Sequence, residues 1–154
     1  MSQIKEKLAE LGYELPAAPA PAANYASTQR IGNMVIVSGQ LPMRAGKLHY
    51  VGKLGDDISA EEAVKAAELC ALNVLAQLEA AIGDLDAVKQ VVRLGVFVNS
   101  TNDYTAHPAA ANGASDLMVA VFGEDVGAHA RAAVGVGSLP LGVSVEVEGM
   151  FEIG

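Results

Sequence analysis

The stretch from residue 129 to residue 148 reads HARAAVGVGSLPLGVSVEVE and decides how the chain ends. Valines alternate with small residues on both sides of Leu139-Pro140, and Gly142 follows the proline. Short apolar runs separated by proline and glycine are typical of two strands joined by a turn. We therefore expect the chain to close with a hairpin whose turn lies at Pro140.

Arg131 is the one cation in the first of these two strands. A guanidinium is charged at every physiological pH, so its place among Ala, Val and Gly is costly unless an anion meets it. Its planar fork matches a carboxylate through two parallel hydrogen bonds. Two interpretations follow: Arg131 clamps a small acid, or it forms an exposed ion pair with Glu148.

Composition argues against several classes of function. The chain has 154 residues and a net charge of −8. This length is typical of one domain. A chain with this negative charge repels the phosphate backbone of nucleic acids, and we therefore expect no nucleic acid partner. Cys70 is the single cysteine and falls in a helical pattern, where we expect a buried side chain rather than a reactive thiol. The sequence shows neither a signal peptide nor an apolar run of ~20 residues, which predicts a cytoplasmic protein without membrane contact.

Residues 1–24 are predicted to form an N-terminal segment of their own. Ser2 caps a short helix that runs to about Leu11. The run Pro16-Ala-Ala-Pro-Ala-Pro-Ala-Ala23 cannot continue a helix and predicts an extended connector. Residues 25–154 then form the main domain. The helix is expected to dock by its apolar face, for which a neighbouring subunit is one candidate.

Alternating and β-branched apolar residues predict the strands of the main domain. Tyr25–Arg30 and Met34–Ser38 flank Gly32-Asn33, a pair suited to a tight hairpin turn. Lys47–Val51 is predicted to add a third short strand, and Val88–Val98 a longer one.

Two long helices are predicted from apolar residues at helical spacing. Ser59 and Glu62 form a capping box at the start of the first helix, and Gly83 ends it.

The second helix is predicted to be less regular. It begins after a cap at Ser100 or Thr101 and runs to Phe122. Pro108 lacks a backbone donor and Gly113 lowers helix propensity, so its first half is expected to be irregular or kinked.

These elements predict an α+β fold in which both long helices pack on one face of a mixed β-sheet. The opposite face then has no cover of its own. The strands supply more apolar surface than one helical layer can bury, and a symmetric oligomer would bury the remainder. The residues that supply it are Met34, Ile36, Val92, Val96, Val134, Val145 and Val147.

Four motifs, in order along the chain, carry a resemblance to a known family. They are Gly32-Asn-Met-Val-Ile-Val-Ser38-Gly39-Gln40-Leu-Pro42, Gly95-Val-Phe-Val-Asn-Ser-Thr-Asn-Asp-Tyr104, Ala130-Arg131-Ala-Ala-Val-Gly-Val-Gly-Ser-Leu139-Pro140 and Val145-Glu146-Val-Glu148. From about Tyr25 onward the chain resembles the RidA/YjgF family of reactive-intermediate deaminases, also described as endoribonuclease L-PSP or chorismate-mutase-like proteins. The resemblance implies that family's α+β fold, a homotrimer, and ligand clefts between subunits.

The resemblance also implies a reaction and the residues that perform it. Deaminases of this family hydrolyse imines and enamines such as 2-aminoacrylate to a 2-keto acid and ammonia. Arg131 would grip the substrate carboxylate, Glu146 would position the attacking water, and Tyr25, Ser38 and Gly39 would line the cleft. The expected partner is a small carboxylate metabolite, and neither a metal nor an organic cofactor is required.

The chain departs from the pattern of the family's deaminases. Ala133, in the predicted cleft two residues after the arginine, stands where those deaminases carry a cysteine. Their helix asparagine has two candidates here, Asn112 and Ser115. His129 shares a strand face with Arg131 and is expected to line the cleft. The chain thus resembles a diverged branch, and three functions stay open: an imine deaminase, a non-catalytic small-acid sensor, and an endoribonuclease, against which the acidic charge argues.

The predicted hairpin separates the two candidate catalytic residues. Simple pairing about Pro140 would set Arg131 opposite Gly149, three residues from Glu146 and roughly 10 Å away along the strand. We therefore expect a bridging water or ligand rather than direct contact, with a structural ion pair as the alternative role of Glu146. Metal-ligand spacing is absent from the three histidines, so no metal site is expected; they are His49, His107 and His129.

Overall fold

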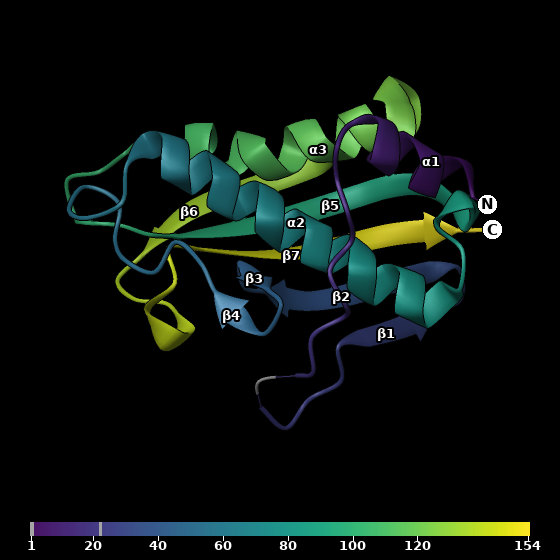
Figure 1. The fold of residues 1–154 in the computed structure, drawn as a ribbon, viewed down its shortest axis with the longest axis horizontal. Coiled ribbons are helices and arrows are strands. Elements are labelled where there is room, and N and C mark those ends of the chain that lie inside the picture. The colour runs from purple at the N-terminus through teal and green to yellow at the C-terminus, as the bar shows by residue number, and fades with distance from the viewer. Residues whose placement is uncertain (1, 22) are drawn as a thin grey trace.

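A computed structural model describes residues 2–21 and 23–154 of the chain (Figure 1). Met1 and Ala22, which belong to the predicted N-terminal segment and connector, lie outside the described residues. The helices are α1 (Gln3–Glu10), α2 (Ala60–Ile82) and α3 (His107–Gly127), with short 3-10 turns η1 (Leu85–Ala87) and η2 (Pro140–Gly142). The strands are β1 (Thr28–Ile31), β2 (Met34–Gln40), β3 (Met43–Arg44), β4 (Lys47–Leu48), β5 (Val88–Asn99), β6 (Ala130–Val136) and β7 (Val145–Ile153).

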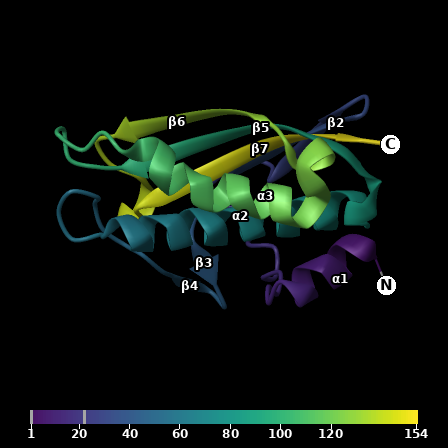
Figure 2. The ribbon, with the colours of Figure 1, turned by 90° about the horizontal axis from the view of Figure 1, so that it is seen from above.

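Five strands form one mixed sheet in the order β1-β2-β7-β5-β6. Only β5 and β6 run parallel, and the other neighbours are antiparallel. Both long helices, α2 and α3, lie on the same face of this sheet (Figure 2). The predicted mixed α+β layering is therefore confirmed. The predicted strand Lys47–Val51 is reduced to β4, which pairs with β3 in a ribbon outside the main sheet.

The predicted closing hairpin is wrong, because β6 and β7 lie on opposite sides of β5 and do not pair with each other. β6 follows α3 in a crossover connection, and such a connection places a strand parallel to the one before it. The turn η2 then carries the chain past β5 to β7. Arg131 consequently pairs with Leu94 of β5, and not with Gly149.

The local sequence explains both ends of α2. The Ser59 hydroxyl accepts the N–H of Glu62 at 3.1 Å, and the Glu62 carboxylate accepts the N–H of Ser59 at 3.1 Å, as the predicted capping box requires. Gly83 ends the helix with a φ of 86°, which favours glycine. Cys70 is fully buried within α2, and burial raises the pKa of its thiol well above the usual value. The prediction of a buried side chain at Cys70 is confirmed.

The start of α3 differs from the prediction. The helix begins at His107, six residues after Thr101, and Pro108 occupies its first turn. A proline there sacrifices no helical hydrogen bond, so it starts the helix instead of interrupting it. Gly113 causes no kink either. A Cβ at Gly113 would collide with the carbonyl of Val64, so the glycine lets α3 pack closely on α2.

The end of α3 matches the prediction in part. Gly123 follows the predicted last residue, Phe122, and adopts non-helical angles of φ 85° and ψ 167°. One further helical turn then extends to Gly127. This extra turn brings the carbonyl of Gly127 close to the start of β6.

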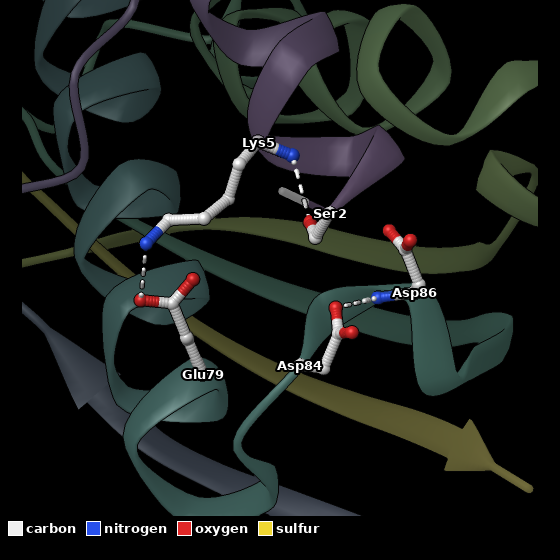
Figure 3. Close-up of polar contacts among 5 residues, drawn as sticks. All are labelled: Ser2, Lys5, Glu79, Asp84 and Asp86. Atoms are coloured by element: carbon white, nitrogen blue, oxygen red, sulfur yellow. Dashed lines mark hydrogen bonds and ion pairs between the residues drawn. The ribbon is translucent and has the colours of Figure 1, made fainter.

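α1 docks on the same chain, as Figure 3 shows. Ser2 accepts the N–H of Lys5 at 3.0 Å, which confirms the predicted cap. The carboxylate of Asp86 in η1 accepts the first two N–H groups of α1 at 2.8 and 2.9 Å, and these bonds lower the pKa of Asp86. Lys5 Nζ lies 3.4 Å from a carboxylate oxygen of Glu79, and Leu8 is buried. The division of the chain at residue 24 stays a prediction.

The second face of the sheet carries no helix in the part of the chain that the structure describes (Figure 2). Ile36 is 37% exposed and Val134 is 45% exposed on this face. Val96, Val145 and Val147 instead point toward the helices and are buried. The expectation of an uncovered, partly apolar face is thus confirmed, although these three valines do not belong to it.

Candidate active site

Arg131 is held by two neutral acceptors from α3. Its Nη1 donates to Asn112 Oδ1 at 2.8 Å and to Ser115 Oγ at 3.1 Å. Arg131 thus reaches, from the edge strand β6, over the face of the sheet that the helices cover. Among residues 2–21 and 23–154, no carboxylate lies within ion-pair distance of the guanidinium. Its positive charge is therefore available to an external anion.

His129 fixes the hydroxyl beside Arg131. Its Nδ1 lies 2.7 Å from the carbonyl oxygen of Gly127, and its Nε2 lies 2.8 Å from Ser115 Oγ. A carbonyl oxygen can only accept, so Nδ1 carries the proton and, in the neutral ring, Nε2 accepts. The Ser115 hydroxyl then donates to His129 and accepts from Arg131. His129 therefore acts on Arg131 through Ser115, an arrangement that the sequence pattern did not reveal.

Glu146 lies on the opposite face of the sheet, next to Gly39 of β2. A Cβ at Gly39 would lie 2.5 Å from Glu146 Oε2, so a larger residue there would displace this carboxylate. Partial burial, and next the negative charge of Glu148, raise the pKa of Glu146. A raised pKa suits a group that accepts a proton near neutral pH.

Glu148 forms an ion pair with Arg93 and not with Arg131. Its carboxylate lies 3.6 Å from Arg93 Nη1, and both side chains are partly exposed. The interpretation of Arg131 as the partner of Glu148 is therefore wrong. The structural ion pair considered for Glu146 is also not observed among the described residues.

One strand separates Arg131 from Glu146. Arg131 pairs with Leu94 of β5, and Glu146 pairs with Phe97 of the same strand. Paired residues share a face of a sheet, and residues three apart along a strand point to opposite faces. Leu94 is buried beneath the helices, whereas Phe97 is on the uncovered side. The structure therefore does not bring Arg131 and Glu146 together within one chain.

The remaining predicted site residues divide between the two faces. Tyr25 is 45% exposed and lines, with Gly39, a cavity of about 40 Å³. Ser38 donates through its hydroxyl to the carbonyl of Ala26 at 2.7 Å, which holds the segment after Tyr25 against β2. Ala133 lies on β6 two residues from Arg131, with its methyl group against the core.

Two further features concern metals and membranes. Within the described ranges, 2–21 and 23–154, no three His, Cys, Asp or Glu side chains are grouped so that they could hold a metal ion. In the same ranges no helix is both long enough and apolar enough to cross a bilayer.

Comparison with known proteins places this geometry in context. Residues 5–151 match the family described as "YjgF/chorismate mutase-like, putative endoribonuclease". The chain is 50% identical to the protein TCP17 of Trypanosoma cruzi over 98% of this chain and 94% of that protein. It is 33% identical to a 2-iminobutanoate/2-iminopropanoate deaminase of Salmonella typhimurium, over 85% of this chain and 88% of the deaminase.

Solved structures show the same fold. A protein of unknown function from Agrobacterium tumefaciens superposes with a TM-score of 0.91 at 45% identity, covering 98% of this chain and 92% of that chain. The identity to TCP17 thus exceeds the identity to this deaminase.

Proposed function

Because the chain belongs to the YjgF/chorismate mutase-like family, we propose that it binds a small imine or 2-keto acid by its carboxylate and hydrolyses the imine to a 2-keto acid and ammonia. The observation that carries the proposal is the Arg131 guanidinium, which α3 positions with neutral acceptors and no acid. A relative at 33% identity is named as a deaminase of such imines. A cytoplasmic enzyme that needs no cofactor is part of this proposal.

The proposed chemistry requires little beyond positioning. Two parallel hydrogen bonds from Arg131 to the carboxylate hold the imine carbon in one place. Water adds to that carbon while Glu146 takes a proton from the water. The electron pair of the C=N bond moves to nitrogen, and Glu146 returns the proton to that nitrogen. The hydroxyl proton then passes to nitrogen as the C–N bond breaks, which releases ammonia and leaves the 2-keto acid.

We also propose that a second copy of the chain completes the site. Arg131 and Glu146 occupy opposite faces of one sheet, so a single protomer presents two half-sites. A neighbour that covers the apolar residues Ile36 and Val134 would bring its own Glu146 to the edge strand β6. The homotrimer with clefts between subunits is the assembly that this proposal assumes.

The test is the release of keto acid from 2-iminobutanoate that a dehydratase forms in situ from threonine. We expect wild-type protein to accelerate release above the spontaneous rate and Arg131→Ala to abolish the acceleration. Arg44→Ala, which removes an exposed arginine from the β3–β4 ribbon, is the matched control and keeps full activity. Acceleration that survives Arg131→Ala contradicts the proposal.

Assays of 2-oxobutanoate binding and of RNA cleavage, run beside the release assay, separate the two other functions. A small-acid sensor would bind 2-oxobutanoate with Arg131 but release no keto acid faster than background. An endoribonuclease would cleave RNA, and the family description carries that word. The net charge of −8 opposes binding of a phosphate backbone, so we expect no cleavage that follows the protein through purification.

A further inference from the structure

A second polar cavity lies where β5 ends and α3 begins. Its volume is about 230 Å³, and Ser100, Tyr104, His107 and Gly135 contribute to its wall. Ser100 Oγ and His107 Nε2 lie 3.1 Å apart, and the ring of Tyr104 meets the imidazole edge-on with centroids 5.5 Å apart. The proposed reaction uses none of these side chains.

Gly135 makes room for two of the side chains that form the wall of this cavity. A Cβ at Gly135 would collide with His107 Nε2 and would lie 2.9 Å from Ser100 Oγ. The glycine thus allows the imidazole to lie over β6 and to keep its contact with the hydroxyl. Every second residue of a strand lies on the same face, so residues 131, 133 and 135 share one face of β6. The cavity therefore lies on the same face as Arg131.

The distance between the cavity and Arg131 suits one small ligand. Asn112, which accepts from Arg131, follows His107 by five residues of α3, or roughly 7.5 Å along the helix axis. On the strand side, only the methyl group of Ala133 stands between Arg131 and Gly135. Arg131 and Gly135 are four residues apart, or roughly 13 Å along β6. Hydrogen bonds of about 3 Å at each end leave roughly 7 Å, which a diacid of about four or five carbons spans.

The charge beside the cavity favours an anion. Lys53 Nζ donates to the carbonyl of Gly137 at 2.6 Å and lies 3.4 Å from the carbonyl of Ser100, so its ammonium group borders the cavity. Asp57 accepts from the backbone N–H of Lys53 at 2.7 Å, and Asp103 accepts from the Thr101 hydroxyl. Both carboxylates are exposed, where solvent screens their charge.

We propose that the Ser100–His107 cavity binds the second carboxylate of a diacid whose 2-keto or 2-imino acid end is held by Arg131. This inference rests on the proposed function and narrows its substrate class to keto and imino diacids of about four or five carbons. His107 Nε2 donates to Ser100 Oγ, the Ser100 hydroxyl donates to the distal carboxylate, Lys53 adds positive charge, and Gly135 leaves room for the imidazole.

Calorimetric titration with three keto acids tests the proposal. Pyruvate has no side-chain extension, 2-oxobutanoate has an apolar one, and 2-oxoglutarate ends in a carboxylate. We expect wild-type protein to bind 2-oxoglutarate at least about tenfold more tightly than 2-oxobutanoate. His107→Ala and Gly135→Ala are each expected to remove this preference and to leave the affinity for pyruvate unchanged. His49→Ala, which changes a histidine elsewhere on the chain, is the matched control.

The outcomes separate this proposal from the one on which it rests. If wild-type protein binds pyruvate through Arg131 but 2-oxoglutarate no more tightly than 2-oxobutanoate, the diacid proposal is overturned and the proposed function stands. A preference for 2-oxoglutarate that persists in folded His107→Ala overturns it as well. If none of the three acids binds, both proposals fail together. Circular dichroism shows whether Gly135→Ala folds, and His107→Ala supplies the result if it does not.

Discussion

Arg131 and Glu146 project from opposite faces of the same five-stranded sheet. Arg131 bonds to α3 on the face that the helices cover, whereas Glu146 lies beside Gly39 on the uncovered face. β5 runs between the two strands that carry them. In one protomer, therefore, the two side chains proposed to hold the substrate carboxylate and to accept a proton do not meet, which is why we propose that a second copy of the chain completes the site.

Replacement of Arg131 tests its proposed role in binding the carboxylate of the ligand. Arg131→Ala is expected to weaken 2-oxobutanoate binding by about 2–3 kcal/mol, or roughly 30- to 150-fold, because charged hydrogen bonds are lost. Arg131→Lys keeps the charge but not the planar fork, so it should recover only part of the loss. Calorimetric titration measures both, and unchanged affinity in Arg131→Ala would contradict the assignment.

Ser115 and His129 are expected to position Arg131 as one unit. Ser115→Ala and His129→Ala should each weaken keto-acid binding about fivefold, although neither residue forms an ion pair with the ligand. Because both act through the same hydroxyl, the double variant should lose little more than either single variant. A double-mutant cycle in calorimetry measures this coupling. Fully additive losses would show that the two residues act independently.

The raised pKa of Glu146 predicts a pH-dependent effect on stability. The folded state binds the proton of this carboxyl more tightly than the unfolded state does, so stability falls as pH rises from the ordinary glutamate pKa through the raised one. Glu146→Gln has no charge to bury and should raise the thermal midpoint by about 2 °C at neutral pH.

The control for that experiment lies on the same strand. Below the ordinary pKa of glutamate, the advantage of Glu146→Gln over wild type should disappear. Glu152→Gln, an exposed change on β7, should alter the midpoint at neither pH. Scanning calorimetry at both pH values decides the matter, and a lower midpoint for Glu146→Gln at neutral pH would show that the carboxylate stabilises the fold.

Asp86 is expected to hold α1 in place. Asp86→Ala leaves the first two N–H groups of α1 without their acceptor, so amides of α1 should exchange with deuterium faster while those of α2 do not change. The pKa of Asp86 is lowered in the fold, so its contribution is complete above the ordinary aspartate pKa and is lost as pH falls through the lowered value. Asp116→Asn, an exposed change on α3, is the control, and equal exchange in both variants would contradict the anchor.

Local chemistry made much of the fold predictable. The capping box at Ser59 and Glu62, the glycine at the end of α2 and the buried Cys70 all follow from residues close together in sequence. The layered α+β arrangement follows from periodicity. The order of the strands does not follow from periodicity. The alternation of apolar residues in β6 is the same whether β6 pairs with β5 or with β7. The pattern about Pro140 therefore predicts a hairpin, whereas the chain passes β5 before it forms β7.

The residues of the candidate site stay a prediction, and the contacts among them could not be derived from the sequence. Arg131 is recognisable in the sequence because a single cation in an apolar strand costs free energy unless an anion or a polar acceptor meets it. Its bonds to Asn112 and Ser115 depend on where α3 begins. In the sequence Pro108 indicates an interruption of the helix, whereas in the structure it lies in the first turn. The role of His129 depends on the carbonyl of Gly127, which no side-chain pattern reports.

Mixed oligomers test most directly whether Arg131 of one copy works with Glu146 of another. Arg131→Ala and Glu146→Gln, each inactive alone, are unfolded, mixed in equal amounts and refolded together. If each site takes one residue from each of two protomers, about a quarter of the sites regain both residues, and a quarter of the wild-type rate of keto-acid release returns. A mixture that stays as inactive as its two components would contradict a site shared between copies.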